Sequence, residues 1–343
     1  IEQTQASGST EGSELSAEVL PLFKKGRNTP SYSFGDIDGD GLEDVVIAVS
    51  GAPELFWISG STDGLGQPRR FPSFTSITSI SQGQFFKDQS PSLVVVSVEE
   101  AIVGLSEVED NGRLSFPKEL KLSEDTPILC EALDWDGDGF DELAVVYDKD
   151  SEMRLVIAAP QDRTQPELGW ITLAEKELGL MRRAPNALSK MDIFEGSEIG
   201  LVLFNPREAP VFIKLDALAE TTIEECFKAS SIRQSFLKGI GPSQVSLADL
   251  NQNGLIEMVV GRAGYARSLQ VEEGDLKMID QFNARRSSDV VSAILLRMDV
   301  TKRPEVGLYI ADSGELQWLS PEADGVFRYR KTETLGEIEL VDT

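Results

Sequence analysis

Short apolar runs separated by turn residues recur along most of the chain. The clearest runs lie at residues 45–49, 93–96, 143–147, 201–204, 258–261 and 308–311. Runs of four or five residues that are rich in Val, Leu and Ile are typical of buried strands rather than of helices. We therefore expect an all-β protein.

Further strands are expected in the intervals between these runs. They lie at residues 55–58, 101–105, 155–158, 211–215, 268–271 and 316–319. Residues 71–74 and 326–330 alternate between apolar and polar side chains, which is typical of half-exposed outer strands. Residues 173–180 and 217–225 have the pattern of short helical pieces, and we expect them to be excursions on one rim.

A common turn precedes each of the clearest runs and reveals a repeat. Its copies begin at Asp36, Gln84, Asp134, Asp192, Asp249, Asp299 and Asp342, at intervals of 43 to 58 residues. Four short strands with their turns take about 40–50 residues, which is the size of one propeller blade. The repeat predicts a β-propeller of four-stranded blades over residues 17–343. Residues 1–16 are polar and lack periodicity, so we expect a flexible linker there.

The two ends of the repeat array predict how the ring closes. Residues 336–343 have the pattern of the first strand of a further repeat, and residues 17–23 have that of an outermost strand. Building one blade from both ends leaves no open strand edge. We expect seven blades, the last incomplete in this chain and closed by the N-terminal strand. The alternative is a six-bladed ring with residues 335–343 as a tail.

Three of the repeated turns carry the oxygen side chains of a metal loop. Oxygen side chains stand at positions 1, 3, 5 and 9, and position 7 can offer its backbone carbonyl. Calcium takes six to eight oxygen ligands at about 2.3–2.6 Å, so about two to three Ca²⁺ ions are expected. The candidate side-chain ligands are Asp36, Asp38, Asp40, Asp44, Asp134, Asp136, Asp138, Glu142, Asp249, Asn251, Asn253 and Glu257, and the candidate carbonyls are those of Leu42, Phe140 and Leu255.

The surroundings of the loops separate them from helix–loop–helix calcium hands. Such a hand needs Glu at position 12, where this chain has Ile47, Val145 and Val260. Each loop therefore joins two strands, and we expect its ion to stiffen the turn. The loop that starts at Asp249 has only two carboxylates, so we expect it to be the weakest site. We expect the loops that start at Gln84, Asp192 and Asp299 to be metal-free.

Composition and charge exclude several classes of function. The chain has 58 acidic and 32 basic residues and a net charge of −26, which disfavours nucleic acid and anionic membranes as partners. It contains no histidine, the commonest general base. Cys130 and Cys226 have no metal-binding spacing, and we expect them to be unpaired. No apolar run approaches the about 18 residues that span a membrane.

The three loops resemble the Asp-x-Asp-x-Asp-Gly-x-x-Asp calcium loop of FG-GAP/VCBS repeats in integrin-like β-propellers. Phe34-Gly35 before the first loop and Gly51-Ala52-Pro53 after its strand are similar to the pieces that name that family. The resemblance implies a non-catalytic calcium-binding scaffold or protein-interaction module. From the calcium loops, the N-terminal linker and the incomplete last blade we expect the chain to be a mature or trimmed segment of a larger exported protein, which is extracellular, on the cell surface or periplasmic. The expected partner is another protein or a neighbouring domain.

Two other functions remain open from the sequence. A carbohydrate-binding, lectin-like propeller has candidate stacking residues in Trp57, Trp135, Trp170 and Trp318. Some propellers similar to this family cleave polysaccharides, generally with Tyr, His or Arg. The absence of histidine and the scattering of the five tyrosines favour a protein that is not an enzyme.

Overall fold

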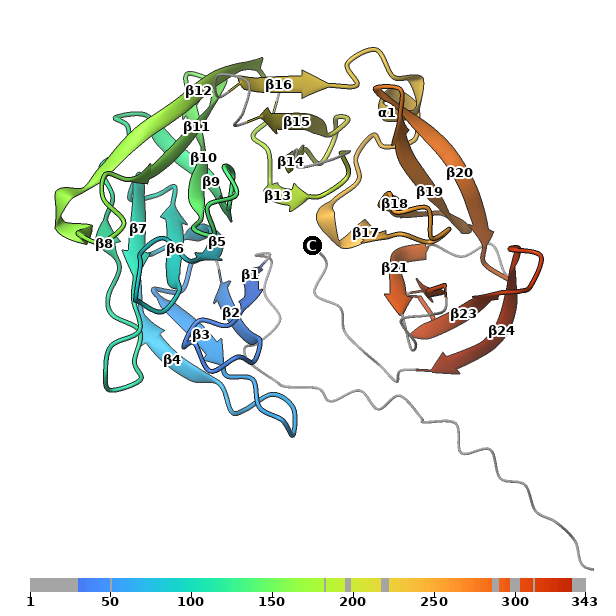
Figure 1. Ribbon diagram of the computed structural model, residues 1–343, viewed down its shortest axis with the longest axis horizontal. Coiled ribbons are helices and arrows are strands. Elements are labelled where there is room, and N and C mark those ends of the chain that lie inside the picture. Colours follow the sequence, from blue (N-terminus) through green and yellow to red (C-terminus); the bar gives the residue numbers. More distant parts are fainter. Residues whose placement is uncertain are drawn as a thin grey trace, which may run out of the picture.

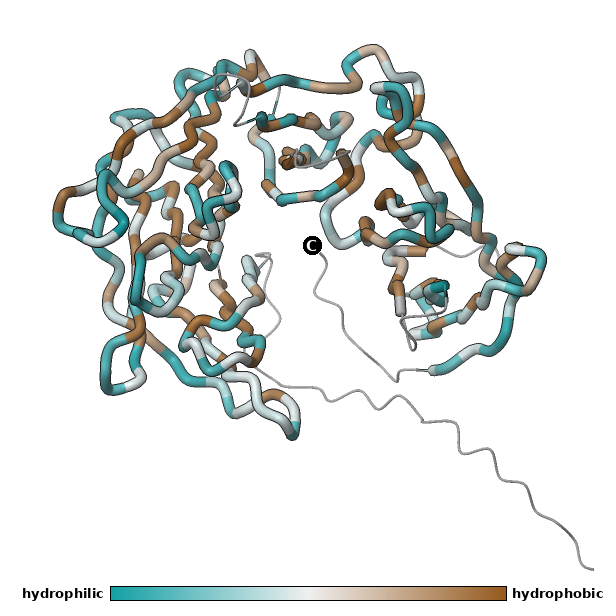
Figure 2. Tube along the Cα trace, in the orientation of Figure 1, coloured by the Kyte–Doolittle hydropathy of each residue, from teal (hydrophilic) through white to brown (hydrophobic). Residues whose placement is uncertain are grey.

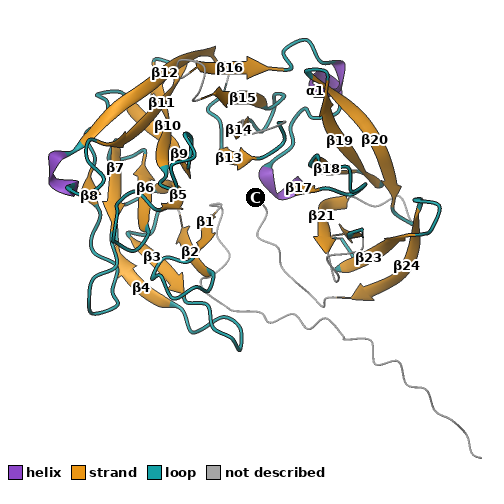
Figure 3. Ribbon diagram, viewed as in Figure 1, coloured by secondary structure: helices purple, strands orange, loops and turns teal. Residues whose placement is uncertain are grey.

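Six four-stranded antiparallel sheets are arranged around a central axis (Figure 1). This computed structural model describes residues 30–334 except 50, 182, 195–198, 217–221, 286–289, 297–302 and 311. The described chain is almost entirely strand and loop (Figure 3). The predicted all-β propeller is confirmed, with six blades in the described residues. The expected linker at residues 1–16, the strand at 17–23 and the partial blade at 335–343 lie outside them.

Each blade takes four strands in chain order. The first blade contains β1 (Pro30–Gly35), β2 (Asp44–Val49), β3 (Glu54–Ile58) and β4 (Arg69–Pro72). The second contains β5 (Ile77–Gly83), β6 (Ser92–Ser97), β7 (Ile102–Ser106) and β8 (Lys118–Glu119). The third contains β9 (Thr126–Leu133), β10 (Glu142–Lys149), β11 (Glu152–Pro160) and β12 (Trp170–Leu180).

The remaining three blades repeat this order. The fourth contains β13 (Ala187–Met191), β14 (Ile199–Phe204), β15 (Val211–Asp216) and β16 (Thr222–Cys226). The fifth contains β17 (Val245–Ala248), β18 (Glu257–Arg262), β19 (Tyr265–Glu272) and β20 (Asp275–Asn283). The sixth contains β21 (Val290–Leu296), β22 (Glu305–Ile310), β23 (Glu315–Pro321) and β24 (Phe327–Thr334). Short helices lie at η1 (Pro166–Leu168), α1 (Ser231–Ser235) and η2 (Pro242–Gln244).

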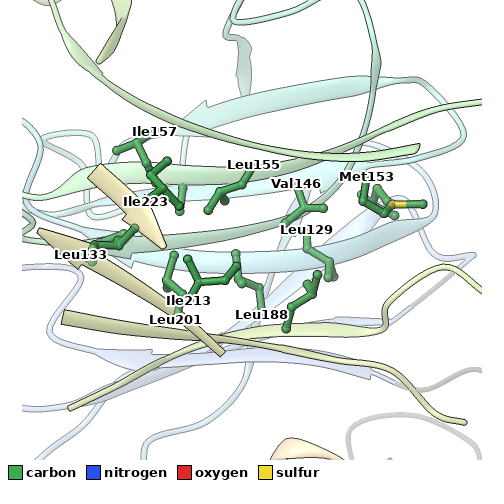
Figure 4. Packing of buried hydrophobic residues seen from close by; sticks show 14 of the residues in the cluster. Leu129, Leu133, Val146, Met153, Leu155, Ile157, Leu188, Leu201, Ile213 and Ile223 are labelled. Carbon is green, nitrogen blue, oxygen red and sulfur yellow. The ribbon is translucent and has the colours of Figure 1, made fainter. Parts of the chain in front are cut away.

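The core lies between consecutive blades. One cluster packs Leu129, Val146 and Leu155 of the third blade against Leu188 and Leu201 of the fourth (Figure 4). Four other clusters join blades one and two, two and three, four and five, and five and six. The second strand of a blade therefore has both faces covered, which explains its continuous apolar run. In Figure 2 hydrophobic residues follow the strands, whereas the outer loops are largely hydrophilic.

Hydroxyl side chains link the innermost strands of neighbouring blades. The Ser31 hydroxyl donates to the Thr78 carbonyl at 2.8 Å, and the Thr78 hydroxyl donates to the Ile128 carbonyl at 2.8 Å. The Ser79 hydroxyl accepts from the Cys130 amide at 3.1 Å. An innermost strand has an unpaired edge, and these hydroxyls satisfy backbone groups there.

The two expected helical pieces are wrong where the structure describes them. Residues 173–180 belong to β12, and residues 222–226 form β16; residues 217–221 lie outside the described chain. The Lys- and Glu-rich composition of 173–180 favours a helix locally, but pairing with β11 outweighs that preference. Neither Cys130 nor Cys226 forms a disulfide in the part of the chain that the structure describes.

Candidate functional site

The first metal loop brings three of its predicted carboxylates together. Oxygen atoms of Asp36, Asp38 and Asp40 lie within 4.8 Å of one another. Asp36 also shapes the turn, because its carboxylate accepts from the amides of Gly39 and Gly41, each at 2.8 Å. Gly39 and Gly41 have φ values of 77° and 88°, which glycine adopts without steric cost.

The second loop repeats this arrangement. Asp134, Asp136 and Asp138 form a similar group, and the Asp134 carboxylate accepts from Gly137 at 2.8 Å and Gly139 at 3.1 Å. These two acidic groups have the donor chemistry and spacing to hold a metal ion. The expectation of metal sites at both places is therefore supported at the level of the acidic clusters.

Position 9 has a different role from positions 1, 3 and 5. Asp44, Glu142 and Glu257 are buried, with at most 1% of each residue exposed. Each accepts a hydrogen bond from the amide of position 2, as in the 2.8 Å bond from Trp135 to Glu142. These carboxylates fix the start of the loop and are not members of the acidic groups.

Position 7 contributes to the turn through its amide. The amides of Leu42, Phe140 and Leu255 each donate at 2.8 Å to the side chain of position 5. The ligand role of their carbonyls stays a prediction.

The third loop forms the same turn with fewer charges. The Asp249 carboxylate accepts from Asn253 at 3.1 Å and from Gly254 at 3.0 Å, and the second of these bonds is common to all three loops. The Asn251 amide group donates to the buried Glu257 carboxylate. Gln252 stands where the other loops have glycine and adopts a φ of 62°. Amides at positions 3 and 5 are thus sufficient for the turn itself.

Charge accumulates in the first loop. Burial, followed by repulsion from Asp44 and Asp40, raises the pKa of Asp38 above its ordinary value. A bound cation would remove that repulsion, so the residues present fit a divalent ion with oxygen ligands.

An arginine reaches the second loop from the turn after β11. The Arg163 guanidinium donates to the carbonyl of Asp141 at 2.6 Å and to the Glu142 carboxylate. One of its nitrogens lies 3.9 Å from Asp138. The Asp141 carboxylate accepts from the Gln84 amide at 2.6 Å, so this cluster also joins the second and third blades.

A separate cavity of about 490 Å³ lies among the innermost strands. Its walls come from β1, β5, β9, the start of β13 and the turn before β17 (Figure 1). Most of the lining side chains are neutral, including Gln82, Asn186 and Ser189. The cavity therefore lies in the central channel of the propeller.

Glu131 is the acidic residue among those that line the channel cavity. Its carboxylate accepts a hydrogen bond from the Lys190 amide at 3.2 Å. Burial raises its pKa from 4.5 to about 7, opposed by that hydrogen bond and by the Lys190 charge. A carboxyl group poised near neutral pH in a cavity is suited to general acid–base chemistry.

Glu131 is not among the residues that the sequence alone predicts to be functional. In the sequence, Glu131 is distinguished only as the single carboxylate within the apolar stretch 128–133. A buried titratable group can also have a purely structural role, so that signal gains chemical meaning only with the cavity and Lys190 beside it.

The tryptophans considered for sugar stacking are mostly in the core. Trp57, Trp135 and Trp318 are at most 4% exposed. Trp170 is half-buried and packs edge-on against Phe85, with 5.2 Å between the ring centroids. Three of the four candidate stacking faces are therefore inaccessible.

Comparisons with known proteins identify similar structures but no family. No family model matches the chain, and no curated protein matches it. A periplasmic gluconolactonase of Pseudomonas aeruginosa is similar with a TM-score of 0.52 and 11% identity, over 90% of this chain and 85% of that one. A putative 6-phosphogluconolactonase of Bacteroides uniformis has a TM-score of 0.52 and 10% identity, over 88% and 85%. A putative 6-phosphogluconolactonase of Bacteroides fragilis has 0.50 and 9%, over 89% and 84%.

These findings correct the expected family. The resemblance to FG-GAP/VCBS repeats is wrong as an assignment, because no family model matches and the similar structures are lactonase propellers. The physical reason lies in the loops, since the third one forms the same turn with amides in place of carboxylates. The motif indicates a local turn between two strands, and it does not indicate membership of a particular family.

The expected function is corrected by the same comparisons. We expected a non-catalytic scaffold or a lectin, whereas the similar structures are described as lactonases and hence as enzymes. The partner protein or neighbouring domain stays a prediction. Within the described residues, no helix has the length and apolar character needed to cross a membrane. At 9–11% identity the comparisons show the fold, which is a β-propeller.

Proposed function

We propose that this protein is a hydrolase that opens a small lactone ring in the central channel, with Glu131 as the general base. The observation that carries the proposal is the Glu131 carboxyl group, which lines the cavity with its pKa raised to about 7 and with Lys190 beside it. A general base works best when its pKa lies near the working pH.

Glu131, which lines the cavity, and Lys190, whose charge acts on Glu131, would supply the elements of ester hydrolysis. The Glu131 carboxylate takes a proton from water as the water oxygen attacks the lactone carbonyl carbon. The Lys190 ammonium stabilises the negative oxygen of the tetrahedral intermediate. The ring C–O bond then breaks, and the leaving oxygen takes the proton from Glu131, which yields a hydroxy acid. Glu131 ends in its starting state.

The similar structures support this class of substrate. Two of them are described as putative 6-phosphogluconolactonases and one as a gluconolactonase. Since a fold alone does not determine function, the proposal depends on Glu131 and its cavity.

We also propose that the acidic loops hold Ca²⁺. Their side-chain donors are oxygen atoms, which suit a hard cation, and no sulfur or imidazole is offered. The ion would neutralise the clustered carboxylates and stiffen the turn. Its place is the loop, and no step of the hydrolysis is assigned to it.

We further propose that the protein works outside the cytoplasm. Loops of this type suit compartments with about millimolar calcium, and one similar structure is that of a periplasmic protein. Cell fractionation with antibodies to the chain tests this location.

The experiment is a lactonase assay with a matched pair of variants. Hydrolysis of glucono-δ-lactone and of a panel of five- and six-membered lactones is followed in a pH-stat between about pH 6 and 8. Wild type is compared with Glu131→Gln and with Glu119→Gln, which removes a carboxylate from the exposed strand β8.

We expect Glu131→Gln to lower kcat/KM at least about 100-fold, the usual contribution of a general base. Glu119→Gln keeps the wild-type rate. Wild-type activity rises with pH through a single ionisation near 7. The proposal is overturned if no lactone is hydrolysed faster than in buffer, or if Glu131→Gln keeps full activity.

A further inference from the structure

A cationic hollow lies on the rim between the third, fourth and fifth blades. Its basic residues are Arg183 from the β12–β13 connection, Arg207 from the β14–β15 turn, Arg233 from α1 and Lys238 just after α1. The hollow has a volume of about 640 Å³. Four cations around one hollow contrast with the net charge of −26 of the chain.

Three of these four cations have no ion-pair partner among the described residues. Within the ranges that the structure describes, no carboxylate oxygen lies within 4.0 Å of a charged nitrogen of Arg183, Arg207 or Lys238. Glu208 is the acidic residue among those lining the hollow. Burial lowers the pKa of Arg233, which Glu225 partly opposes. Arg183, Arg207 and Lys238 are exposed, and their like charges repel one another around one hollow, so the arrangement favours an external anion.

One buried side chain fixes the backbone of two of the arginines. Asn205 is 4% exposed. Its amide nitrogen donates to the Arg183 carbonyl at 2.9 Å, and its oxygen accepts from the Arg207 amide at 3.2 Å. The backbones of Arg183 and Arg207 are thus held in place without a ligand.

Hydrogen bonds also fix the part of the hollow formed by α1 and the residues that follow it. The Arg233 guanidinium donates from Nε to the Pro210 carbonyl at 2.6 Å, which leaves its two terminal nitrogens directed away from that bond. The Gly239 amide donates to the Glu208 carbonyl at 2.9 Å and joins the α1 connection to the β14–β15 turn. The β12–β13 connection, the β14–β15 turn and α1 with the residues after it are therefore held together around the hollow before any ligand binds.

We propose that this hollow binds a tetrahedral oxyanion, the phosphate or sulfate group of a small ligand. A guanidinium offers paired donors that match such an oxyanion, and several guanidiniums with a lysine can surround it. The field of a chain with net charge −26 opposes anions elsewhere on the surface. Binding must therefore be local to these residues, and it is independent of catalysis in the channel.

The test is calorimetric titration with inorganic sulfate and, separately, inorganic phosphate, in metal-free buffer at constant ionic strength. Wild type is compared with Arg183→Gln/Arg207→Gln and with Lys238→Gln. Arg113→Gln serves as the control, because it removes an exposed arginine from the β7–β8 connection, outside the hollow. Circular dichroism checks that each variant is folded.

We expect saturable binding of one anion per chain. The double variant weakens it at least about 10-fold and Lys238→Gln about 3-fold, as expected for removed charge-assisted contacts, while Arg113→Gln leaves it unchanged. Stronger binding of phosphate than of sulfate assigns a phosphorylated ligand, and the reverse order assigns a sulfated one. Absence of saturation with both anions at about 10 mM, or equal weakening by Arg113→Gln, overturns the proposal.

Discussion

Glu131 on β9 and Lys190 on β13 are joined by a 3.2 Å hydrogen bond from the Lys190 amide to the Glu131 carboxylate. The two residues are 59 positions apart and belong to the third and fourth blades. The bond replaces, at this blade junction, the hydroxyl links that join the earlier innermost strands. It places a titratable group where a serine or threonine stands elsewhere, so that one contact has both structural and chemical consequences.

The first prediction is that Glu131 makes stability depend on pH. Its pKa is 4.5 ordinarily and about 7 in the folded chain, so the folded state favours the protonated form. Its contribution is fully present below about pH 4.5 and is lost as the pH rises to about 7. Glu131→Gln removes this dependence and, above pH 7, raises the free energy of unfolding by about 1–3 kcal/mol.

The measurement is urea denaturation at several pH values, with Glu119→Gln as the control on exposed β8. The difference between wild type and Glu131→Gln should grow between pH 4.5 and 7. A difference that is the same at every pH would show that the carboxyl group does not titrate in this window.

The second prediction concerns Arg163, which supports the second loop. Arg163 and Glu142 are an ion pair in which the side chains are 18% and 1% exposed. Arg163→Ala leaves the Glu142 carboxyl group buried without this partner and should lower the free energy of unfolding by about 3 kcal/mol. Adding Glu142→Gln to Arg163→Ala should recover part of the loss.

Chemical denaturation of the single and double variants checks this coupling. Arg70→Ala is the matched control, since Arg70 is 63% exposed and lies 3.7 Å from Glu54. We expect its effect to be within about 0.5 kcal/mol. If Arg163→Ala behaves like Arg70→Ala, the buried pair does not stabilise the loop.

The third prediction concerns backbone strain in the third loop. Gln252 has a φ of 62°, whereas the equivalent Gly39 and Gly137 have 77° and 75°. A non-glycine residue in this region costs about 1–2 kcal/mol, and glycine loses more entropy on folding. Gln252→Gly should therefore raise the free energy of unfolding by about 0.5 kcal/mol, and the reverse change Gly137→Gln should lower it by about 1 kcal/mol. Thermal melts measure the stability of each variant relative to wild type. The prediction requires Gln252→Gly to be more stable than wild type and Gly137→Gln to be less stable.

The sequence predicted the repeat well because each blade is built from local patterns. The run at 143–147 shows its buried strand directly, and the turn at Asp134 shows its own hydrogen-bonding residues within a few positions. The prediction of a helix at 173–180 is wrong because the local composition favours a helix. The strand forms there through pairing with β11, which depends on residues distant in the sequence.

The candidate site was far less visible in the sequence. The meaning of Glu131 depends on Lys190 from the next blade, and that of Arg163 depends on Glu142, 21 positions away. The Arg183–Arg207 arrangement likewise needs Asn205 from a third position. Such groupings depend on how strands within a blade, and neighbouring blades, are placed in the fold, which no local pattern specifies.

The last prediction tests the metal loops by adding a carboxylate to the loop that starts at Asp249, which has the fewest. Asn251 donates from its amide group to the buried Glu257 carboxylate. Asn251→Asp removes that donor and sets two carboxylates against each other, so without metal the variant should be less stable than wild type by about 1 kcal/mol. A third carboxylate should in turn raise the affinity of this loop for Ca²⁺. At a calcium concentration ten times the dissociation constant, binding adds about 1.4 kcal/mol.

The variant should therefore melt below wild type in EGTA and gain more from about 2 mM calcium. Asp38→Asn, in the loop with four carboxylates, should show the opposite pattern, with a smaller gain from calcium than wild type. Thermal melts with and without EGTA, together with metal content by mass spectrometry, measure both. If calcium shifts neither melt and no ion is found, the acidic loops are turns held without a cation. In that case the hydrogen bonds accepted by Asp36 and Asp134, and by the buried carboxylates at position 9, are what stabilise them.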